Sequence, residues 1–245
     1  MTTFVICHGA WSAGWTWKKM HPLMLARGHT LITPSYTGIG ERAHLLTREV
    51  DLDTHITDVL QMLHYEDLQD IVLLGHSYGG MVATGVADRA PERIRHLVYL
   101  DAFVPRNGES AQSLQPASEK QRLQDLANQQ GDGWLVQPNP LPPDTSAEDV
   151  AWALPRRVPQ PLTTFTQAIE LTGAVDKLPR TYIYCTQSRP GDVFRQFYDR
   201  ARQEAGWRAL EMEASHNPHI TCPDALMALL DGLGDQNSLG GQVRP

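Results

Sequence analysis

The chain has 245 residues, of which 41% are hydrophobic and 20% are charged, as is ordinary for a folded α/β domain. Its net charge of −7 argues against nucleic acid and against anionic membranes as partners. The sequence shows no apolar run of the roughly 18 residues that a membrane span needs, and no secretory leader at its start. We therefore expect a cytoplasmic protein without a membrane span.

Apolar runs alternate with helical patterns along the chain. Buried strands are predicted at residues 3–7, 30–34, 71–75, 95–100, 180–185 and 207–212. Helices are predicted at residues 15–27, 53–63 with Asp53 as the N-cap, 80–89, 193–204 and 223–233. Strands that alternate with helices predict a mostly parallel central sheet flanked by helices, with ligands bound at the carboxyl ends of its strands.

Residues 103–178 interrupt this alternation, because prolines are frequent there among Gln-rich and acidic helical pieces. The segment is too long to be a simple connection. We expect an inserted helical lid at residues 103–178 over a core made of residues 1–102 and 179–233. Residues 234–245 contain three glycines and no apolar face, so a flexible tail is expected there.

The cysteines of the chain predict neither a metal site nor a disulfide framework. Cys7, Cys185 and Cys222 show no metal-ligand spacing, and three cysteines cannot all pair. Cys7 and Cys185 lie in apolar strand-like runs, and Cys222 opens a helix, where a thiolate could be favoured. Packing roles are favoured for all three, and we expect no metal and no cofactor.

The motif Gly-His-Ser-Tyr-Gly at residues 75–79 lies between a predicted buried strand and a predicted helix. This G-x-S-x-G pattern is typical of a sharp turn that lifts the hydroxyl of Ser77 above the sheet edge. The amides at the start of the following helix would face charge that develops near Ser77. The alternative is a Gly-rich turn with a solvated serine.

A serine hydroxyl becomes a good nucleophile when an imidazole removes its proton and a carboxylate orients that imidazole. His216, in the loop after the last predicted strand, is the candidate base, and His219 is the reserve. Asp101 ends the strand that follows the Ser77 turn, whereas Asp192 lies in the loop after the next strand. Rigidity favours Asp101 as the acid, with Asp192 as the alternative.

Acyl transfer also needs donors for the oxyanion, and two turns supply them. The backbone N–H of Tyr78 is one candidate, and the N–H of Ala10, or that of Trp11, is the other. The side chain of His8 is expected to brace this loop. Candidates for the substrate pocket, although aromatic residues also fill cores and lids, are Trp11, Tyr36, His76, Phe103, Trp134, Trp152 and Phe165.

Six segments in the first half of the chain carry a family resemblance: residues 4–11, 14–17, 38–42, 51–55, 75–80 and 97–105. Through them the chain resembles the α/β-hydrolase superfamily. It is most similar to the branch of plant methyl esterases of the salicylate-binding type, plant hydroxynitrile lyases and bacterial pyrethroid-hydrolase-like esterases. The resemblance implies Ser77 as nucleophile, His216 as base, and the amides of Ala10 and Tyr78 as the oxyanion hole.

The chain departs from this branch at three positions. Most of these relatives carry their acid in the loop after the strand equivalent to residues 181–185, where this chain has Ser188. Haloalkane dehalogenases similarly place their acid where Asp101 stands. Hydroxynitrile lyases of the branch have cysteine after the elbow serine and lysine after the catalytic histidine, but this chain has Tyr78 and Asn217. Cyanohydrin cleavage is therefore disfavoured.

The sequence thus predicts a cofactor-free serine carboxylesterase that hydrolyses a small to medium apolar or aromatic ester through an acyl-enzyme. Its expected partner is that small-molecule substrate. The alternatives are a non-hydrolytic lyase and a binding module that has lost turnover, as some hormone receptors of this fold have. The physiological substrate cannot be named from the sequence, and a homodimer is compatible with it.

Overall fold

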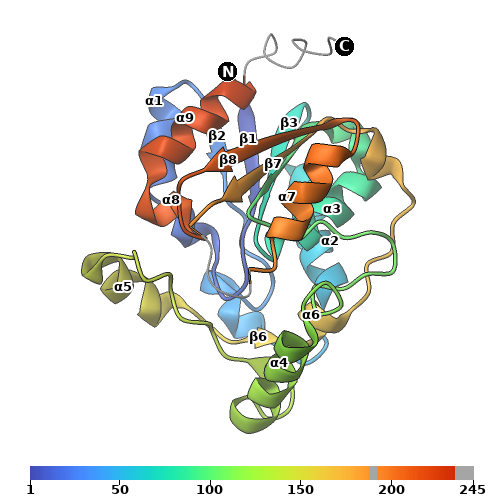
Figure 1. Cartoon of the computed structure of the whole chain (residues 1–245), viewed down its shortest axis with the longest axis vertical. Helices are drawn as coiled ribbons and strands as arrows, with labels where there is room; N and C mark the ends of the chain where they lie inside the picture. Colours follow the sequence, from blue (N-terminus) through green and yellow to red (C-terminus); the bar gives the residue numbers. More distant parts are fainter. Residues whose placement is uncertain (188–191, 235–245) are drawn as a thin grey trace.

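The computed structural model describes residues 1–187 and 192–234 and contains a six-stranded sheet in the order β2-β1-β3-β4-β7-β8 (Figure 1). Each strand runs parallel to its neighbours. The strands are β1 (Thr3–Cys7), β2 (Thr30–Ile32), β3 (Ile71–His76), β4 (Ile94–Leu100), β7 (Arg180–Cys185) and β8 (Trp207–Met212). The strand order reverses between β1 and β3, and ligands of open parallel sheets bind beside such a reversal.

Helices cover both faces of this sheet (Figure 1). One face carries α1 (Met20–Ala26) and α9 (Pro223–Gly234), and the other carries α2 (Leu52–Tyr65), α3 (Gly79–Arg89) and α7 (Arg195–Gln203). Alternate residues of β1 serve the two faces: Phe4 and Ile6 pack in the cluster under α1 and α9, and Val5 and Cys7 pack in the other. This alternation explains why the strands read as continuous apolar runs.

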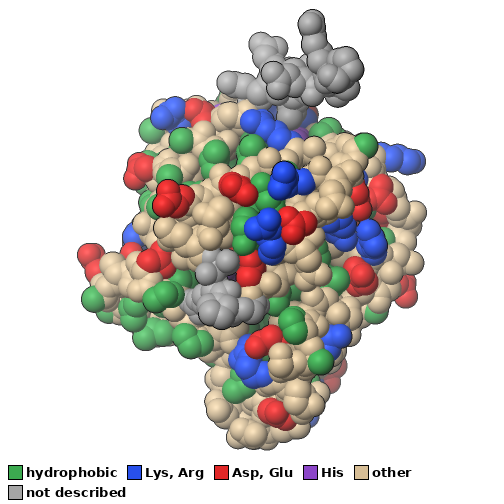
Figure 2. All heavy atoms as spheres, in the orientation of Figure 1, with side chains coloured by type: hydrophobic (Ala, Val, Ile, Leu, Met, Phe, Trp, Pro, Cys, Tyr) green, Lys and Arg blue, Asp and Glu red, His purple; other side chains and the backbone are tan. Residues whose placement is uncertain are grey.

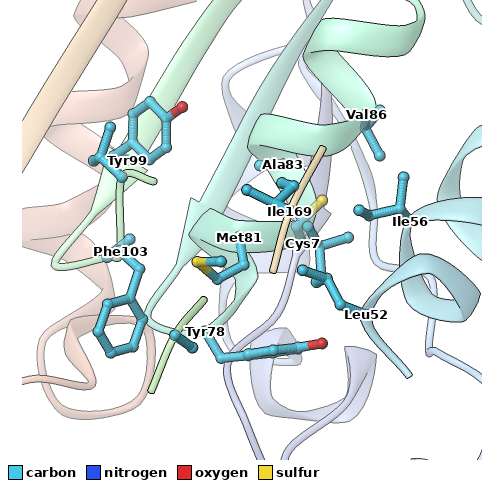
Figure 3. Packing of buried hydrophobic residues seen from close by; sticks show 14 of the residues in the cluster. Cys7, Leu52, Ile56, Tyr78, Met81, Ala83, Val86, Tyr99, Phe103 and Ile169 are labelled. Atoms are coloured by element: carbon cyan, nitrogen blue, oxygen red, sulfur yellow. The ribbon is translucent and has the colours of Figure 1, made fainter. Parts of the chain in front are cut away.

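The cluster between the sheet, α2 and α3 holds the turn after β3 in place. Figure 3 shows members of this cluster, with Met81 and Val86 from α3, Leu52 and Ile56 from α2, and Tyr99 from β4. Each of these five side chains is at most 1% exposed. Burying an apolar side chain of this size contributes about 1.5–3 kcal/mol, so the start of α3 is firmly anchored.

Residues 103–178 contain one long helix, several short helices and two short strands that pair in antiparallel fashion. They are α4 (Ala117–Gln130), β5 (Leu135–Val136), α5 (Ala147–Ala153), η4 (Leu154–Arg156), β6 (Gln160–Pro161), α6 (Thr163–Thr166) and η5 (Ala174–Lys177). In Figure 1, α4, α5, α6 and β6 lie beyond one end of the sheet, and Figure 2 shows apolar side chains gathered over α5. The division of the chain into core and lid stays a prediction, and residues 235–245 of the expected tail lie outside the described residues.

The predicted helix at residues 15–27 is two elements, η1 (Gly14–Trp17) and α1, which begins at Met20. Pro22 explains the break, because its ring lacks an N–H and would clash with a helical carbonyl four residues earlier. In the first turn of α1 that missing donor has no cost. The remaining short helices are η2 (Gly40–Leu45), η3 (Pro91–Arg93) and α8 (Pro218–Thr221).

The predicted N-cap of α2, Asp53, is wrong, because the cap is Asp51. The Oδ1 atom of Asp51 accepts from the N–H of Thr54 at 2.8 Å, and the hydroxyl of Thr54 accepts from the N–H of Asp51 at 3.4 Å. This reciprocal capping box satisfies two amides at once, whereas Asp53 lies in the first turn and pairs with Arg89. Within the described ranges, no helix is long and apolar enough to cross a membrane.

Candidate active site

Ser77 follows β3 at a sharp turn, with a left-handed backbone φ of 55°. The turn depends on the two glycines around it. A Cβ on Gly79 would lie 1.9 Å from the carbonyl oxygen of Cys7, and a Cβ on Gly75 would lie 2.7 Å from that of Gly79. Neither backbone atom can give way, so larger residues are excluded. The turn therefore has the strained geometry that the G-x-S-x-G motif predicts.

His216 lies between Ser77 and Asp101. Its Nε2 atom is 2.9 Å from Ser77 Oγ, and its Nδ1 atom is 2.7 Å from Asp101 Oδ2. Since an ionised carboxylate can only accept, Nδ1–H donates to Asp101, and Nε2 is left to accept the serine proton. The ring of Phe194 stacks on the imidazole at 4.9 Å between centroids and limits its rotation. These three side chains can pass a proton from hydroxyl to imidazole.

Asp101 follows β4 directly and is 5% exposed. Its Oδ1 atom accepts from the N–H of Cys185 at 3.3 Å, while Oδ2 accepts from His216. Burial raises the pKa of the Asp101 carboxyl above its usual value, and the hydrogen bond from His216 opposes this rise. A buried carboxylate needs such partners, and the imidazole is the main one.

Asp192, the alternative acid, is turned toward other donors. Its carboxylate accepts from the hydroxyl of Tyr184 at 2.6 Å and from the N–H of Phe194 at 2.8 Å. No hydrogen bond joins Asp192 to His216 among the described residues. Asp192 lies at the cavity wall, and through Phe194 it supports the ring that stacks on His216.

The loop after β1 brings Ala10 and Trp11 to the same edge of the sheet as Ser77. The N–H of Trp11 donates to Oε1 of Gln160 at 3.0 Å, and its indole N–H donates to the carbonyl of Val136 at 2.8 Å. In the described part of the chain, the N–H groups of Ala10 and Tyr78 have no hydrogen-bond acceptor. These two amides are the donors left available for an oxyanion.

Two histidines brace the loops on either side. Nδ1–H of His8 donates to the carbonyl of Gly9 at 2.9 Å, and Nε2 accepts from the N–H of Tyr36 at 3.4 Å. His76, inside the elbow, donates from Nε2–H to the backbone carbonyl of His216 at 2.7 Å. Burial lowers the pKa of His8 to about 4 and that of His76 well below its ordinary value, so both rings are neutral.

His219, the reserve base, is not placed for proton transfer from the serine. Its ring stacks on Trp17 with centroids 4.5 Å apart and meets His76 edge-on at 4.7 Å. Burial lowers the pKa of His219 to about 3. A ring that is 2% exposed and lies against an indole packs the core under α8.

Ser77 opens into a cavity of about 730 Å³ that residues from the core and from residues 103–178 line together. Of the aromatic candidates and His76, those in its wall are Trp11, His76, Phe103 and Phe165. Trp11 and Phe165 lie against each other, with centroids 5.5 Å apart. Three of the predicted aromatic residues, together with His76, therefore form part of the cavity wall.

The other three aromatic candidates lie elsewhere. Tyr36 is fully buried and stacks on His8 at 3.8 Å between centroids. Trp134 lies under the guanidinium of Arg48, and Trp152 meets another tryptophan edge-on. Aromatic residues that fill cores and lids look the same in a sequence as aromatic residues that line pockets.

Gln160 and Arg157 are functional candidates that sequence reasoning missed. Both lie in the Pro-rich stretch before α6, and no motif marks either residue. Their importance comes from Trp11, which contacts both across the fold. In residues 1–187 and 192–234, no group of histidine, cysteine, aspartate and glutamate is arranged to hold a metal ion.

Comparisons with known proteins agree with this architecture. The sequence model of the alpha/beta hydrolase family matches residues 4–229. A carbendazim hydrolyzing esterase from Nocardioides sp. (strain SG-4G) is 38% identical over 96% of this chain and 100% of its own length. An alpha-hydroxynitrile lyase from Arabidopsis thaliana is 32% identical, over 42% of this chain and 40% of its own.

A solved structure extends the likeness to three dimensions. An extracellular alpha/beta-hydrolase from a Paenibacillus species, described as sharing structural and functional homology with tobacco salicylic acid binding protein 2, superposes with a TM-score of 0.81. It is 26% identical and is covered completely, while 96% of this chain is covered. The resemblance to plant methyl esterases, hydroxynitrile lyases and pyrethroid hydrolases is confirmed.

Proposed function

The chain belongs to the alpha/beta hydrolase family, and from this premise we propose that it is a serine ester hydrolase acting through an acyl-enzyme. One observation carries the proposal: the imidazole of His216 is 2.9 Å from Ser77 Oγ and 2.7 Å from Asp101 Oδ2. A relative matched over its full length is an esterase, which supports hydrolysis over the lyase and over binding without turnover.

In the proposed mechanism, Ser77 Oγ attacks the ester carbonyl while Nε2 of His216 takes its proton. Asp101 stabilises the imidazolium that forms. The N–H groups of Ala10 and Tyr78 donate to the oxyanion, and each such donor is typically worth about 3–4 kcal/mol of barrier. The intermediate then collapses, and His216 returns the proton to the leaving alcohol.

Water completes the cycle. It attacks the acyl-serine carbonyl and gives its proton to Nε2 of His216. The second intermediate expels Ser77 Oγ, which recovers that proton, and the carboxylic acid leaves. No residue outside the proposed triad and the two amides is needed for proton or charge balance.

The cavity supports small to medium apolar or aromatic esters as substrates. Trp11, Phe103 and Phe165 offer flat apolar walls beside Ser77, and the volume of about 730 Å³ is within the range of small-ligand sites. The relative from Nocardioides is named for the hydrolysis of carbendazim, so carbendazim belongs in a first substrate panel for this chain.

We further propose that residues 103–178 act as the lid that selects the substrate. We place the enzyme in the cytoplasm, because Cys7, Cys185 and Cys222 are free thiols and a reducing compartment suits them. A homodimer stays compatible with the chain. Cell fractionation tests the cytoplasmic location, and size-exclusion chromatography tests the oligomeric state.

The test of the function is Ser77→Ala. We expect it to lower kcat/KM for para-nitrophenyl butyrate by about 10³-fold or more, because the attacking oxygen is removed. Ser118→Ala, an exposed serine on α4, is the control and should behave as the parent. An organophosphate adduct on Ser77, read by mass spectrometry, would show a competent nucleophile. Undiminished turnover by the Ser77→Ala protein would overturn the proposal.

A further inference from the structure

Arg157 is a cation in the wall of the same cavity as Ser77. It follows η4 and is half-buried. Its guanidinium donates to the backbone carbonyl of Asn139. The Cζ atom also lies over the ring of Trp11, 6.0 Å from the centroid. Since Trp11 directly follows Ala10, Arg157 lies close to the loop that presents the proposed oxyanion donor.

The guanidinium of Arg157 has no carboxylate partner among the described residues, unlike that of Arg122. Arg122 is the other cavity-lining cation, and its Nε donates to Glu119 Oε2 at 2.8 Å. A guanidinium offers five N–H donors, and within residues 1–187 and 192–234 the guanidinium of Arg157 has one hydrogen-bond acceptor, the carbonyl of Asn139. Burial lowers the pKa of Arg157 to about 10, so the group is charged at neutral pH.

We propose that Arg157 forms a subsite for a hydrogen-bond-accepting group of the substrate, carried on the part of the ester away from the scissile bond. A half-buried guanidinium without a bound anion forms its strongest hydrogen bonds with a planar acceptor, to which it can donate two parallel N–H groups. The acceptor can be a neutral carbonyl, a ring nitrogen or a carboxylate. This inference rests on the proposed ester hydrolysis and names the kind of ester.

The position of Arg157 in the cavity differs from that of the acidic residues that also line it. Asp144 also lines the cavity but is exposed. Asp192 accepts from Tyr184 and Phe194, and Asp101 accepts from His216. The acidic groups are thus either paired or at the rim, whereas Arg157 lies against the aromatic wall at Trp11. An aromatic ester on that wall would place a ring substituent within reach of the guanidinium.

The experiment compares three methyl esters of similar size: methyl para-ethylbenzoate, methyl para-acetylbenzoate and monomethyl terephthalate. The first carries no second acceptor, the second a neutral one and the third a carboxylate. Relative to the parent, Arg157→Met should lose about tenfold more kcat/KM for the two acceptor-bearing esters than for methyl para-ethylbenzoate, mainly through KM. Electronic effects on the scissile carbonyl cancel, because each ester is compared between two proteins.

Arg156→Met is the matched control. Arg156 is the preceding residue, is exposed, donates to the carbonyl of Trp152 and is not part of the cavity wall. It should keep the parent's order of preference. Arg157→Gln, which keeps a donor toward Asn139, replaces Arg157→Met if thermal melting shows that the methionine variant does not fold.

A loss of kcat/KM limited to monomethyl terephthalate would identify the acceptor as a carboxylate. A loss of kcat/KM for both acceptor-bearing esters would show that the subsite also accepts a neutral carbonyl. Equal losses for all three esters, or none, would overturn the subsite. Calorimetric binding of the same esters to Ser77→Ala protein separates the two proposals. If the parent turns over no ester but binding still prefers acceptors and depends on Arg157, the hydrolase fails and the subsite stands.

Discussion

Asp101 lies at the end of a central strand, whereas Asp192 lies in a loop. Asp101 follows the last residue of β4 in the middle of the sheet, and its own N–H donates to the carbonyl of Ile183 at 2.8 Å. The hydroxyl of Tyr184 and the N–H of Phe194 bind both oxygens of Asp192 instead. Residue types and order along the chain leave both acids open, because the choice depends on where each carboxylate points.

The two acids can be separated by paired asparagine variants. Asp101→Asn should lower kcat by about 10³–10⁴-fold, because an amide in that position no longer holds the tautomer in which Nε2 accepts the serine proton. Asp192→Asn keeps an oxygen toward Tyr184 and Phe194, and we expect a change of a few-fold. Steady-state kinetics with para-nitrophenyl butyrate, alongside circular dichroism, measures both. A large loss confined to Asp192→Asn would reverse the assignment.

At the scale of elements, the strands of the central sheet could be predicted from the sequence, whereas the short elements within residues 103–178 could not. Strands such as Ile71–His76 are continuous apolar runs because both faces are covered, and the elbow follows from local sterics at its glycines. In contrast, β5 and β6 have two residues each. The bond between Trp11 and Gln160 joins residues 149 positions apart, so no local pattern announces it.

The hydrogen bond between Trp11 and Gln160 gives a prediction about residues 103–178. Gln160 is 1% exposed, and its Oε1 fixes the N–H of Trp11 beside the proposed donor Ala10. Gln160→Leu should lower kcat about tenfold with little change in KM, because a misplaced amide weakens binding to the oxyanion more than to the ester. Affinity for a trifluoromethyl ketone, which mimics the tetrahedral intermediate, should fall in parallel.

Two further variants show whether Gln160 acts by positioning the N–H of Trp11 or only through general packing. Gln160→Glu keeps an acceptor toward Trp11 and should recover part of kcat. Thr163→Val removes another hydrogen bond between residues 103–178 and the rest of the chain, from the Thr163 hydroxyl to the carbonyl of Val50, without changing the loop that carries Ala10. If Thr163→Val and Gln160→Leu lower kcat alike, Gln160 serves only the general packing of residues 103–178.

For the whole molecule, sheet topology explains why distant residues meet. The strand order reverses between β1 and β3, so the loop carrying Ala10 and the elbow carrying Ser77 leave the sheet side by side. Asp101 follows β4, the next strand along, and His216 follows β8 at the edge. A parallel sheet places all these loops at one end, which is why order along the chain predicted the candidates.

The same packing buries several histidines as neutral rings, and this makes the fold sensitive to acid. Burial lowers the pKa of His8 and His96 to about 4 and that of His55 and His219 to about 3. An unfolded histidine takes up a proton below about pH 6.5, whereas these folded ones do not until far lower pH. The free energy of unfolding is therefore at its full value above about pH 6.5. This free energy decreases as the pH drops from about 6.5 toward the folded pKa values, by up to about 1.4 kcal/mol per pH unit for each histidine.

Urea unfolding between about pH 7.5 and about pH 5 measures this slope, in a range above the titration of most carboxylates. His55→Gln should make the slope shallower by about one histidine, because the ring of His55 is fully buried against Tyr78 and Thr37. His64→Gln, the same substitution at an exposed position of the same helix, is the matched control. An unchanged slope in the His55→Gln protein would mean that His55 takes up a proton over the same pH range in the folded and the unfolded chain. The core around Tyr78 would then have to hold a charged imidazole, which contradicts the argument from burial.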